Sequence, residues 1–277
     1  MNTPVAAQNK TTPSAARVLN GAILALVSLV GIASFLYPFF QPSVQATATP
    51  GALAHAQDAP LMFMLLIVLS LGAVMGNMLG GSGGLNAKMI AVLGVLTAIN
   101  AVLRVVPGPT GFSAMYVLPI LTGYCYGPTF GYLLGALSLA VSALLGAGIG
   151  PWLPYQMFAL GWVGLTSAWL PKLRRHPRIE IAFLSVWGFG WGIVYGVVMN
   201  VWFWPFVFDP IQAGIYWQPG IGPWEAMKRY LAFYVVTSVW WDLGRAAGNA
   251  VLLALLGVPI LRALRRFGRR FTFNSMS

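Results

Sequence analysis

Charged side chains, and acidic ones above all, are scarce in this sequence of 277 residues. Only 8% of the residues are charged, and 5 Asp and Glu stand against 16 Lys and Arg. Average soluble domains are about one quarter charged, so the composition excludes an ordinary soluble globular protein. The single cysteine, Cys125, excludes an internal disulfide.

Signatures of catalysis and of nucleotide binding are missing as well. No lysine follows a glycine, which excludes a phosphate-binding P-loop. The two histidines, His55 and His176, fall in loops that we expect on opposite sides of a membrane, so no histidine-based metal site is expected. Apart from Asp242, the carboxylates fall in loops or at helix ends (Asp58, Glu180, Asp209 and Glu225). We therefore expect no cofactor, no metal and no catalytic residue.

The sequence is instead rich in long apolar segments. Hydrophobic residues make up 58% of the chain, and residues 105–171 contain no Lys, Arg, Asp, Glu or His. At ~20 apolar residues per membrane span, the pattern predicts an all-α membrane protein. We place eight helices at 18–40, 61–79, 87–106, 113–126, 127–145, 155–170, 181–206 and 228–256, the last ending where Gly257-Val258-Pro259 breaks it.

The first apolar run could instead be a signal peptide. It is longer than an ordinary signal-peptide core, and it ends in Tyr-Pro-Phe-Phe rather than in a small-residue cleavage site. These features favour a transmembrane helix.

The positive charges predict the orientation. Lys and Arg concentrate in cytoplasmic loops, and here they gather near the N-terminus, at Lys88, in the 172–178 loop and in the C-terminal tail. Eight spans place all four segments in the cytoplasm, provided that 113–126 crosses the membrane. The net charge of +11 is thus a topology signal and gives no reason to expect nucleic acid as a partner.

Small residues recur on one face of the third helix. They lie at steps of four and three residues (Ala87, Ala91, Gly94, Ala98 and Ala101). Membrane helices associate through such faces, so this face could pack inside the bundle or against another subunit. Two further ridges, at glycines 127, 131, 135 and 188, 192, 196, are predicted to pack within the bundle.

The last helix carries the most polar face. Asp242, Arg245 and Asn249 follow the i, i+3, i+7 spacing of one helix side. We expect Asp242 near the middle of the bilayer, where an ionisable group costs at least ~2.5 kcal/mol and usually faces a cavity or a partner. A structural Asp–Arg pair and the wall of a polar pocket are both compatible with this face.

Other polar and aromatic residues are candidates for the same pocket. The full candidate set for ligand binding is Asp242, Arg245, Asn249, Asn200, Trp204, Asn100, Arg104, Gln156 and Trp241. Aromatic side chains with a few convergent polar groups suit a small, flat heterocyclic ligand.

Four motifs, in this order, resemble those of one transporter family. They are Gly111-Phe112-Ser113, the helix pair at 124–145, Gly150-Pro151-Trp152-Leu153-Pro154-Tyr155-Gln156-Met157, and Asp242-x-x-Arg245-Ala246-x-x-x-Asn249. Together they resemble the substrate-binding S components of energy-coupling factor (ECF) vitamin transporters, over about 87–262.

The resemblance implies an organisation of the chain. Residues 85–262 would form a six-helix S-component-like core with a pocket near the outer surface. Residues 1–84 would add a cytoplasmic tail, two accessory transmembrane helices and a Gly/Ser linker, whose role the family does not imply. Residues 263–277 would form a basic cytoplasmic tail. The N- and C-termini would both lie inside.

The resemblance also implies a function. The chain would be a high-affinity vitamin-binding subunit of an ECF-type ABC importer in a prokaryotic plasma membrane, surrounded by lipid. Its partners would be a transmembrane coupling subunit, reached through the small-residue stripe that starts at Ala87, and two cytoplasmic ATPases. The turn at 107–113 would cover the pocket. The nearest members take cobalamin-type substrates, while flavin, thiamine and pyrimidine precursors stay open.

Two alternatives come from other classes of protein. A membrane enzyme acting on a lipid or isoprenoid would have to use Asp242 and Arg245 for catalysis. A structural membrane subunit would bind no ligand.

Overall fold

The fold is all-helical. A computed structural model describes residues 15–40, 55–79, 85–106 and 108–272, and these contain no strand. Six helices in this part of the chain are long and apolar enough to cross a membrane. The prediction of an all-α membrane protein is therefore confirmed.

The helices follow the predicted apolar runs closely up to the last one. Their bounds are α1 (Ala15–Leu36), α2 (Ala59–Leu79), α3 (Ala87–Val105), α4 (Val117–Tyr126), α5 (Pro128–Ser142), α6 (Trp152–Ser167), α7 (Pro177–Phe203), α8 (Pro223–Thr237) and α9 (Val239–Thr272). Short 3-10 turns extend α1, α4 and α7, and a π-helical turn (Ala143–Ala147) extends α5.

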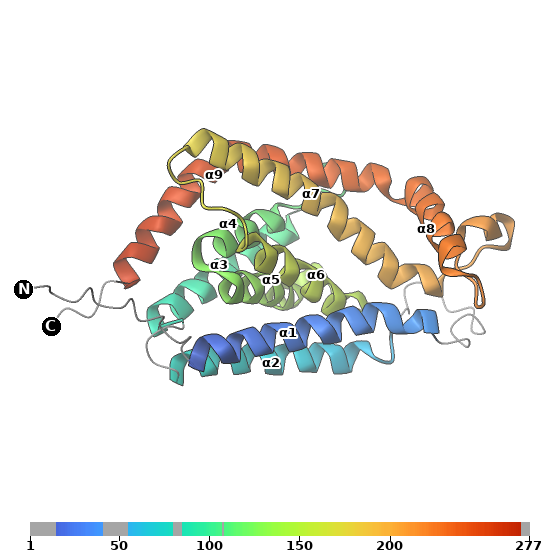
Figure 1. The fold of residues 1–277 in the computed structure, drawn as a ribbon, viewed down its shortest axis with the longest axis horizontal. Helices are drawn as coiled ribbons and strands as arrows, with labels where there is room; N and C mark the ends of the chain where they lie inside the picture. The colour runs from blue at the N-terminus through green and yellow to red at the C-terminus, as the bar shows by residue number, and fades with distance from the viewer. Residues whose placement is uncertain (1–14, 41–54, 80–84, 107, 273–277) are drawn as a thin grey trace, which may run out of the picture.

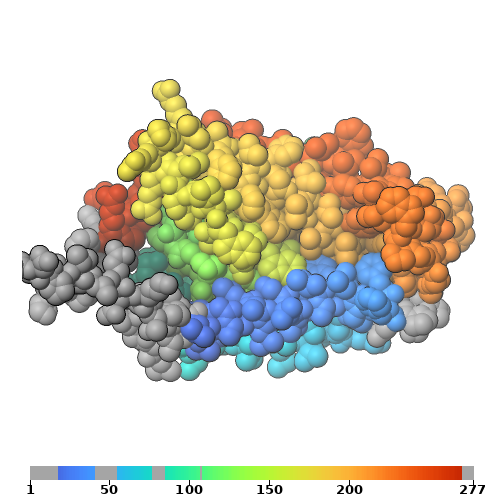
Figure 2. Space-filling model, in the orientation of Figure 1, coloured from blue at the N-terminus to red at the C-terminus, as the bar shows by residue number. Residues whose placement is uncertain are grey.

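The helices form a bundle around two buried short ones. Helix α5 lies along α6, α4 packs on both, and α7 lies along α9. The α1–α2 hairpin covers α5 and α6 from the other side, as Figure 1 shows at the bottom of the view. In the space-filling view α1 lies along the lower flank of the molecule, beneath α7 (Figure 2).

The helix ends gather at two opposite ends of the bundle. Helices α1 and α7 start, and α2 and α9 end, at the same end of the bundle, on the left in Figure 1. Helix α8 and the end of α7 lie at the opposite end.

Glycines let the central helices approach closely. A Cβ at Gly131 would collide with the backbone of Gly164 in α6, and one at Gly192 would collide with Ala246 in α9. Gly135, Gly188 and Gly196 are likewise covered by the facing helix. The predicted packing is confirmed for these positions. It is wrong for Gly127, which faces open space and instead adopts a φ of 100° at the turn into α5.

The last predicted helix is divided differently. The expected break at Gly257–Pro259 is wrong, because α9 continues through Pro259 to Thr272. The break lies at Ser238, with φ −131° and ψ −29°, between α8 and α9. Asp242 therefore sits in the first turn of α9 rather than midway along a long helix.

Two of the helices that the sequence predicts as complete spans are too short to count as spans by length alone. Helix α4 has 10 residues and α6 has 16. At 1.5 Å per residue, α4 extends only about 15 Å. Both lie in the core, where the largest fully buried side chains include Tyr124 from α4 and Tyr155 and Phe158 from α6.

Candidate ligand-binding site

A cavity of about 500 Å³ opens where α6, α7 and the α8–α9 junction meet. Its lining combines an ion pair, three amide or hydroxyl side chains and several aromatic rings. The lining residues are Trp152, Gln156, Gly196, Met199, Asn200, Trp202, Phe203, Ser238, Trp241, Asp242 and Arg245.

Asp242 is the buried acid of this cavity. The residue is only 2% exposed, and its Oδ1 accepts a hydrogen bond of 2.5 Å from Arg245 Nη1. Its Oδ2 has no hydrogen-bond partner among the described residues. The Tyr234 hydroxyl interacts with this carboxylate without reaching hydrogen-bond geometry. A buried carboxylate oxygen normally has a hydrogen-bond partner, so Oδ2 has unused acceptor capacity beside the cavity.

The facing glycine makes room for this carboxylate. A Cβ at Gly196 of α7 would overlap the carboxylate of Asp242. The position of Asp242 in the first turn of α9 also places its negative charge at the positive end of the helix dipole. Both features hold the acid at the cavity wall.

Arg245 is fixed from three directions. Besides Asp242, its Nη1 contacts the carbonyl of Gly192 at 3.3 Å, and its guanidinium lies 5.4 Å from the centre of the Tyr195 ring. The hydrogen bonds of Arg245 within the described part of the chain use Nη1 alone. A guanidinium has five N–H donors, so the others are available to a ligand.

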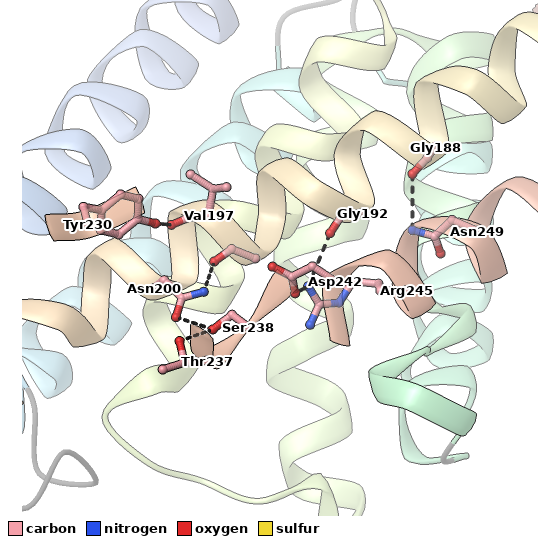
Figure 3. Close-up of polar contacts among 11 residues, drawn as sticks. Gly188, Gly192, Val197, Asn200, Tyr230, Thr237, Ser238, Asp242, Arg245 and Asn249 are labelled. Carbon is pink, nitrogen blue, oxygen red and sulfur yellow. Dashed lines mark hydrogen bonds and ion pairs between the residues drawn. The ribbon is translucent and has the colours of Figure 1, made fainter. Parts of the chain in front are cut away.

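The helix break adds a second polar group. Ser238 Oγ donates to Asn200 Oδ1 at 2.9 Å, and Asn200 Nδ2 donates to the carbonyl of Gly196 at 2.9 Å. Thr237 contacts Ser238 through its hydroxyl, also at 2.9 Å. Figure 3 shows this chain of contacts beside the Asp242–Arg245 pair. The α8–α9 junction is thereby tied to α7 at the cavity.

A second cation lies behind the cavity-lining Gln156. Arg104 of α3 donates to Gln156 Oε1 and to Ser142 Oγ, each at 2.8 Å. It has no ion-pair partner in the described residues. Since Gln156 uses Oε1 for Arg104, its amide N–H₂ is left for the cavity. With Asp242 and Arg245 neutralising each other, Arg104 leaves the region with an excess positive charge.

The residues just before α2 meet the back of the cavity wall. Asp58 accepts hydrogen bonds from the Tyr155 hydroxyl and from His55 Nδ1, the latter at 2.9 Å. Burial raises the pKa of Asp58, but these hydrogen bonds outweigh it and hold the pKa below its usual range. The imidazole of His55 stacks near Trp202, with ring centres 5.8 Å apart. The hairpin thus touches a cavity-lining ring.

The turn before α4 packs against α9. Gly244 and Gly248 leave the space that Thr110 and Phe112 fill, and Gly111 lies against Trp241. Thr110 adopts a positive φ of 50°, a conformation that is uncommon outside glycine. The turn therefore lies next to the cavity on the α9 side.

No three His, Cys, Asp or Glu side chains in the described segments lie close enough together to hold a metal ion.

The family model for the substrate-specific component of ECF transporters matches residues 88–240. This match covers more than half of the chain. The chain belongs to this family. Searches of curated proteins and of solved structures returned no match.

Membership of this family gives the general function of the chain. The protein is an S component, that is, a multi-pass membrane protein and the substrate-binding subunit of an ECF transporter. Members of the family are transport subunits rather than enzymes. The resemblance to this family is therefore confirmed; the match includes the first three motifs, and the motif at Asp242–Asn249 lies beyond it.

The structure of this S component brings together part of the predicted binding set. Asp242, Arg245, Asn200, Gln156 and Trp241 all line the cavity. Arg104 reaches it through Gln156.

The other three predicted residues lie elsewhere. Asn100 donates to Ser138 inside the α3–α5 contact, and Asn249 Nδ2 contacts the carbonyl of Gly188 at 3.4 Å, deeper along α9. Trp204 donates to the carbonyl of Ile215 and packs in a separate buried aromatic cluster with Trp217 and Phe233.

Six residues that line the cavity are not predicted from the sequence as ligand contacts. Trp152, Gly196, Met199, Trp202, Phe203 and Ser238 carry no charge, and they are not among the candidates for ligand binding that the sequence gives. Ser238 had one available signal, since a Thr-Ser pair interrupts an apolar run and such side chains compete with helical hydrogen bonds. Trp152 lies within a family motif but was not singled out as a ligand contact.

The small-residue stripe on α3 faces outwards over most of its length. Ala87, Ala91, Gly94 and Ala98 are exposed, and a Cβ at Gly94 would meet nothing within 4 Å. Ala101 is fully buried. The first four positions thus form a smooth strip that no described helix of this chain covers.

Proposed function

We propose that this S component captures a micronutrient from outside the cell in the cavity beside Asp242 and Arg245. The observation that carries the proposal is the buried Asp242 carboxylate with one oxygen unpartnered, in a cavity rimmed by aromatic rings. Such an oxygen gains a hydrogen bond when a ligand donor replaces water. Ligand sites typically combine apolar walls with a few fixed polar groups.

The lining favours a flat ring system that bears both hydrogen-bond donors and an acidic or strongly accepting group. A donor would meet Asp242 Oδ2, while a carboxylate or phosphate would meet the free N–H groups of Arg245 and the excess charge of Arg104. Trp152, Trp202 and Trp241 offer ring faces and edges for stacking.

The size of the cavity favours a small vitamin. At about 500 Å³ it lies in the lower part of the range of roughly 300–1,000 Å³ for drug-sized ligands. Flavin, thiamine and pyrimidine precursors fit this range. A corrinoid such as cobalamin would extend well outside the cavity, so it is the less favoured of the substrates considered.

The proposed topology has eight spans with both termini in the cytoplasm. The starts of α1 and α7 and the ends of α2 and α9 lie at one end of the bundle (Figure 1). The same end carries the basic loop at 172–178 and the arginines of α9, as the distribution of positive charge in membrane proteins requires. This orientation turns the α8–α9 junction and the cavity to the outside of a prokaryotic plasma membrane.

Energy for import would come from partner subunits. The exposed stripe of Ala87, Ala91, Gly94 and Ala98 supports docking of a transmembrane coupling subunit, because small residues allow close helix contact in lipid. Two cytoplasmic ATPases would supply the nucleotide hydrolysis for which this chain has no P-loop. The core at 85–262 would carry both surfaces, with 1–84 and the basic tail from 263 as additions.

The experiment is a comparison of ligand affinity between two isosteric variants. Asp242→Asn keeps the shape of the side chain but replaces the acceptor pair with one acceptor and one donor, and should weaken binding of a member of a vitamin panel by at least about 10-fold. Asp209→Asn, outside the cavity, should leave the affinity unchanged. Equal affinities for both variants would contradict the assigned site.

The same comparison bears on the enzyme alternative. An S component in which Asp242→Asn changes affinity alone is a binding protein. Conversion of a lipid or isoprenoid by the wild type that Asp242→Asn abolishes would favour an enzyme instead.

A further inference from the structure

A larger cavity lies at the opposite end of the bundle. It measures about 1,010 Å³ and is open, between the start of α7 and the second half of α9. Three arginines line it, Arg175 and Arg178 beside the start of α7 and Arg262 on α9. The vitamin cavity shares no residue with it.

The three arginines are not neutralised by the protein. Within the described residues the nearest acid, Glu180, is 2% exposed and pairs with Arg265 at 2.5 Å. Tyr124 donates a further hydrogen bond of 2.6 Å to the same carboxylate oxygen. Arg175, Arg178 and Arg262 form no ion pair in this part of the structure and are exposed. No acidic side chain of the described segments neutralises their charges.

More positive charge adjoins the cavity along α9. Arg266 and Arg269 line a smaller neighbouring hollow of about 430 Å³ together with Arg262 and Arg265. Like charges this close repel one another, and a bound anion would relieve that repulsion.

The remainder of the cavity is apolar and continues along the two helices. Its wall includes Ile181, Ala182, Ala254 and Val258, and Ile179 is 58% exposed beside them. Ser185 Oγ, also in the lining, is buried without a hydrogen-bond partner among the described residues. A small inorganic anion would contact the arginines but would leave this apolar groove empty.

The cavity has positive charge at one end and an apolar groove at its other end, and this combination fits an amphipathic anion. We propose that the groove between α7 and α9 binds an anionic phospholipid, with its phosphate against Arg175, Arg178 and Arg262 and an acyl chain over Ala182 and Val258. Basic pockets between membrane helices on the cytoplasmic side bind such headgroups. The proposal rests on the cytoplasmic orientation of this end and not on the identity of the vitamin.

The headgroup contacts are tested by native mass spectrometry of the full-length, delipidated protein. Dioleoyl phosphatidylglycerol and dioleoyl phosphatidylcholine are added separately, so that only the headgroup differs. We expect Arg175→Gln/Arg178→Gln/Arg262→Gln to bind phosphatidylglycerol roughly 100-fold more weakly than wild type, since each arginine near an anionic lipid contributes about a factor of five. Phosphatidylcholine should bind weakly to both.

A matched variant separates the groove from bulk charge. Lys88→Gln/Lys172→Gln/Arg174→Gln also removes three charges at this end but changes no residue that lines the larger cavity or the neighbouring hollow. It should bind phosphatidylglycerol within about 5-fold of wild type. Equal weakening in both triple variants, or equal binding of the two lipids to wild type, would overturn the proposal.

The acyl contact needs a separate arm. Ala182→Leu with Ala254→Leu fills the groove while keeping every arginine, and should weaken phosphatidylglycerol binding without affecting binding of glycerol 3-phosphate. If glycerol 3-phosphate binds as tightly as the lipid, or the filled variant keeps full lipid affinity, the ligand is a free phosphate compound and the lipid assignment is wrong. The helical circular dichroism spectrum checks that each variant folds.

Failure here would be distinct from failure of the proposed function. The arginine variants lie outside the vitamin cavity, so binding of the vitamin panel should be the same in wild type and in both triple variants.

Discussion

At the scale of single residues, the candidate site depends on a pair of charges that the protein only partly satisfies. Arg245 uses one nitrogen and Asp242 one oxygen for their mutual contact. Burying two charges is expensive and their attraction often only offsets the cost. An ion pair that leaves donors and an acceptor unused at a cavity contributes little to the stability of the fold. Those unused groups are instead suited to hydrogen bonding with a ligand.

Gly196 offers a test of how tightly that geometry is set. In Gly196→Ala the new methyl group would overlap the Asp242 carboxylate and force it to move, whereas Gly190, on the same helix, has nothing within 4 Å. We expect Gly196→Ala to lose about 1–3 kcal/mol of ligand-binding free energy or of stability, and Gly190→Ala to lose neither. Calorimetric titration and thermal unfolding measure both. Unchanged affinity and stability in Gly196→Ala would mean that Asp242 is not held as described.

The residues that a sequence reveals here are those whose type is unusual for their surroundings. Asp242 and Arg245 stand out because ionisable groups inside an apolar run are costly. Trp152 and Trp202 do not, since tryptophan is common throughout the second half of the chain. Their meeting at the cavity depends on how α6 and α7 pack, and a single sequence does not encode that contact in any local pattern.

At the scale of helices, length and composition predict the elements better than their breaks. Glycine and proline at 257–259 resemble a helix end, yet α9 passes through them. Pro and Gly are tolerated in membrane helices because neighbouring groups satisfy the freed backbone. The actual break at Ser238 lacks both residues and is held by Asn200 from another helix. A tertiary contact thus decides the position of the cavity.

The small-residue stripe on α3 can be tested by adding bulk to it. Gly94→Leu with Ala98→Leu should abolish co-purification with the coupling subunit while sparing ligand binding, because both positions are exposed and added side chains there would prevent close helix contact. Val95→Leu with Val102→Leu adds bulk to neighbouring exposed positions off the stripe and should keep the complex. Loss of ligand binding in the Gly94/Ala98 variant would show that the face packs internally.

At the scale of the whole molecule, the two ends of the bundle differ in chemistry. One end gathers aromatic rings, the Asp242–Arg245 pair and the contact of the α1–α2 hairpin at Asp58, and the other gathers arginines around Glu180. The all-helical membrane fold and the family could be predicted from apolar runs and motifs. The proposed crossing of α4 rests on the distribution of positive charge and not on its length, because α4 is shorter than the roughly 17–25 residues of an ordinary span.

Labelling of single cysteines tests the eight-span topology. In a Cys125→Ser background, Asp209→Cys should react with a membrane-impermeant maleimide on intact cells, and Arg175→Cys should react only after the membrane is permeabilised. We expect this difference in labelling because the two residues lie at opposite ends of the bundle. Labelling of Arg175→Cys in intact cells would place the 172–178 loop outside and contradict the proposed crossing of α4.

Native mass spectrometry of the gently purified protein tests the central claim most directly. We predict that a small vitamin or vitamin precursor co-purifies with the wild type, and that its adduct is lost in Asp242→Asn but retained in Asp209→Asn. A protein that emerges empty, and that also binds no member of a panel of flavin, thiamine, pyrimidine-precursor and cobalamin ligands, would contradict the account.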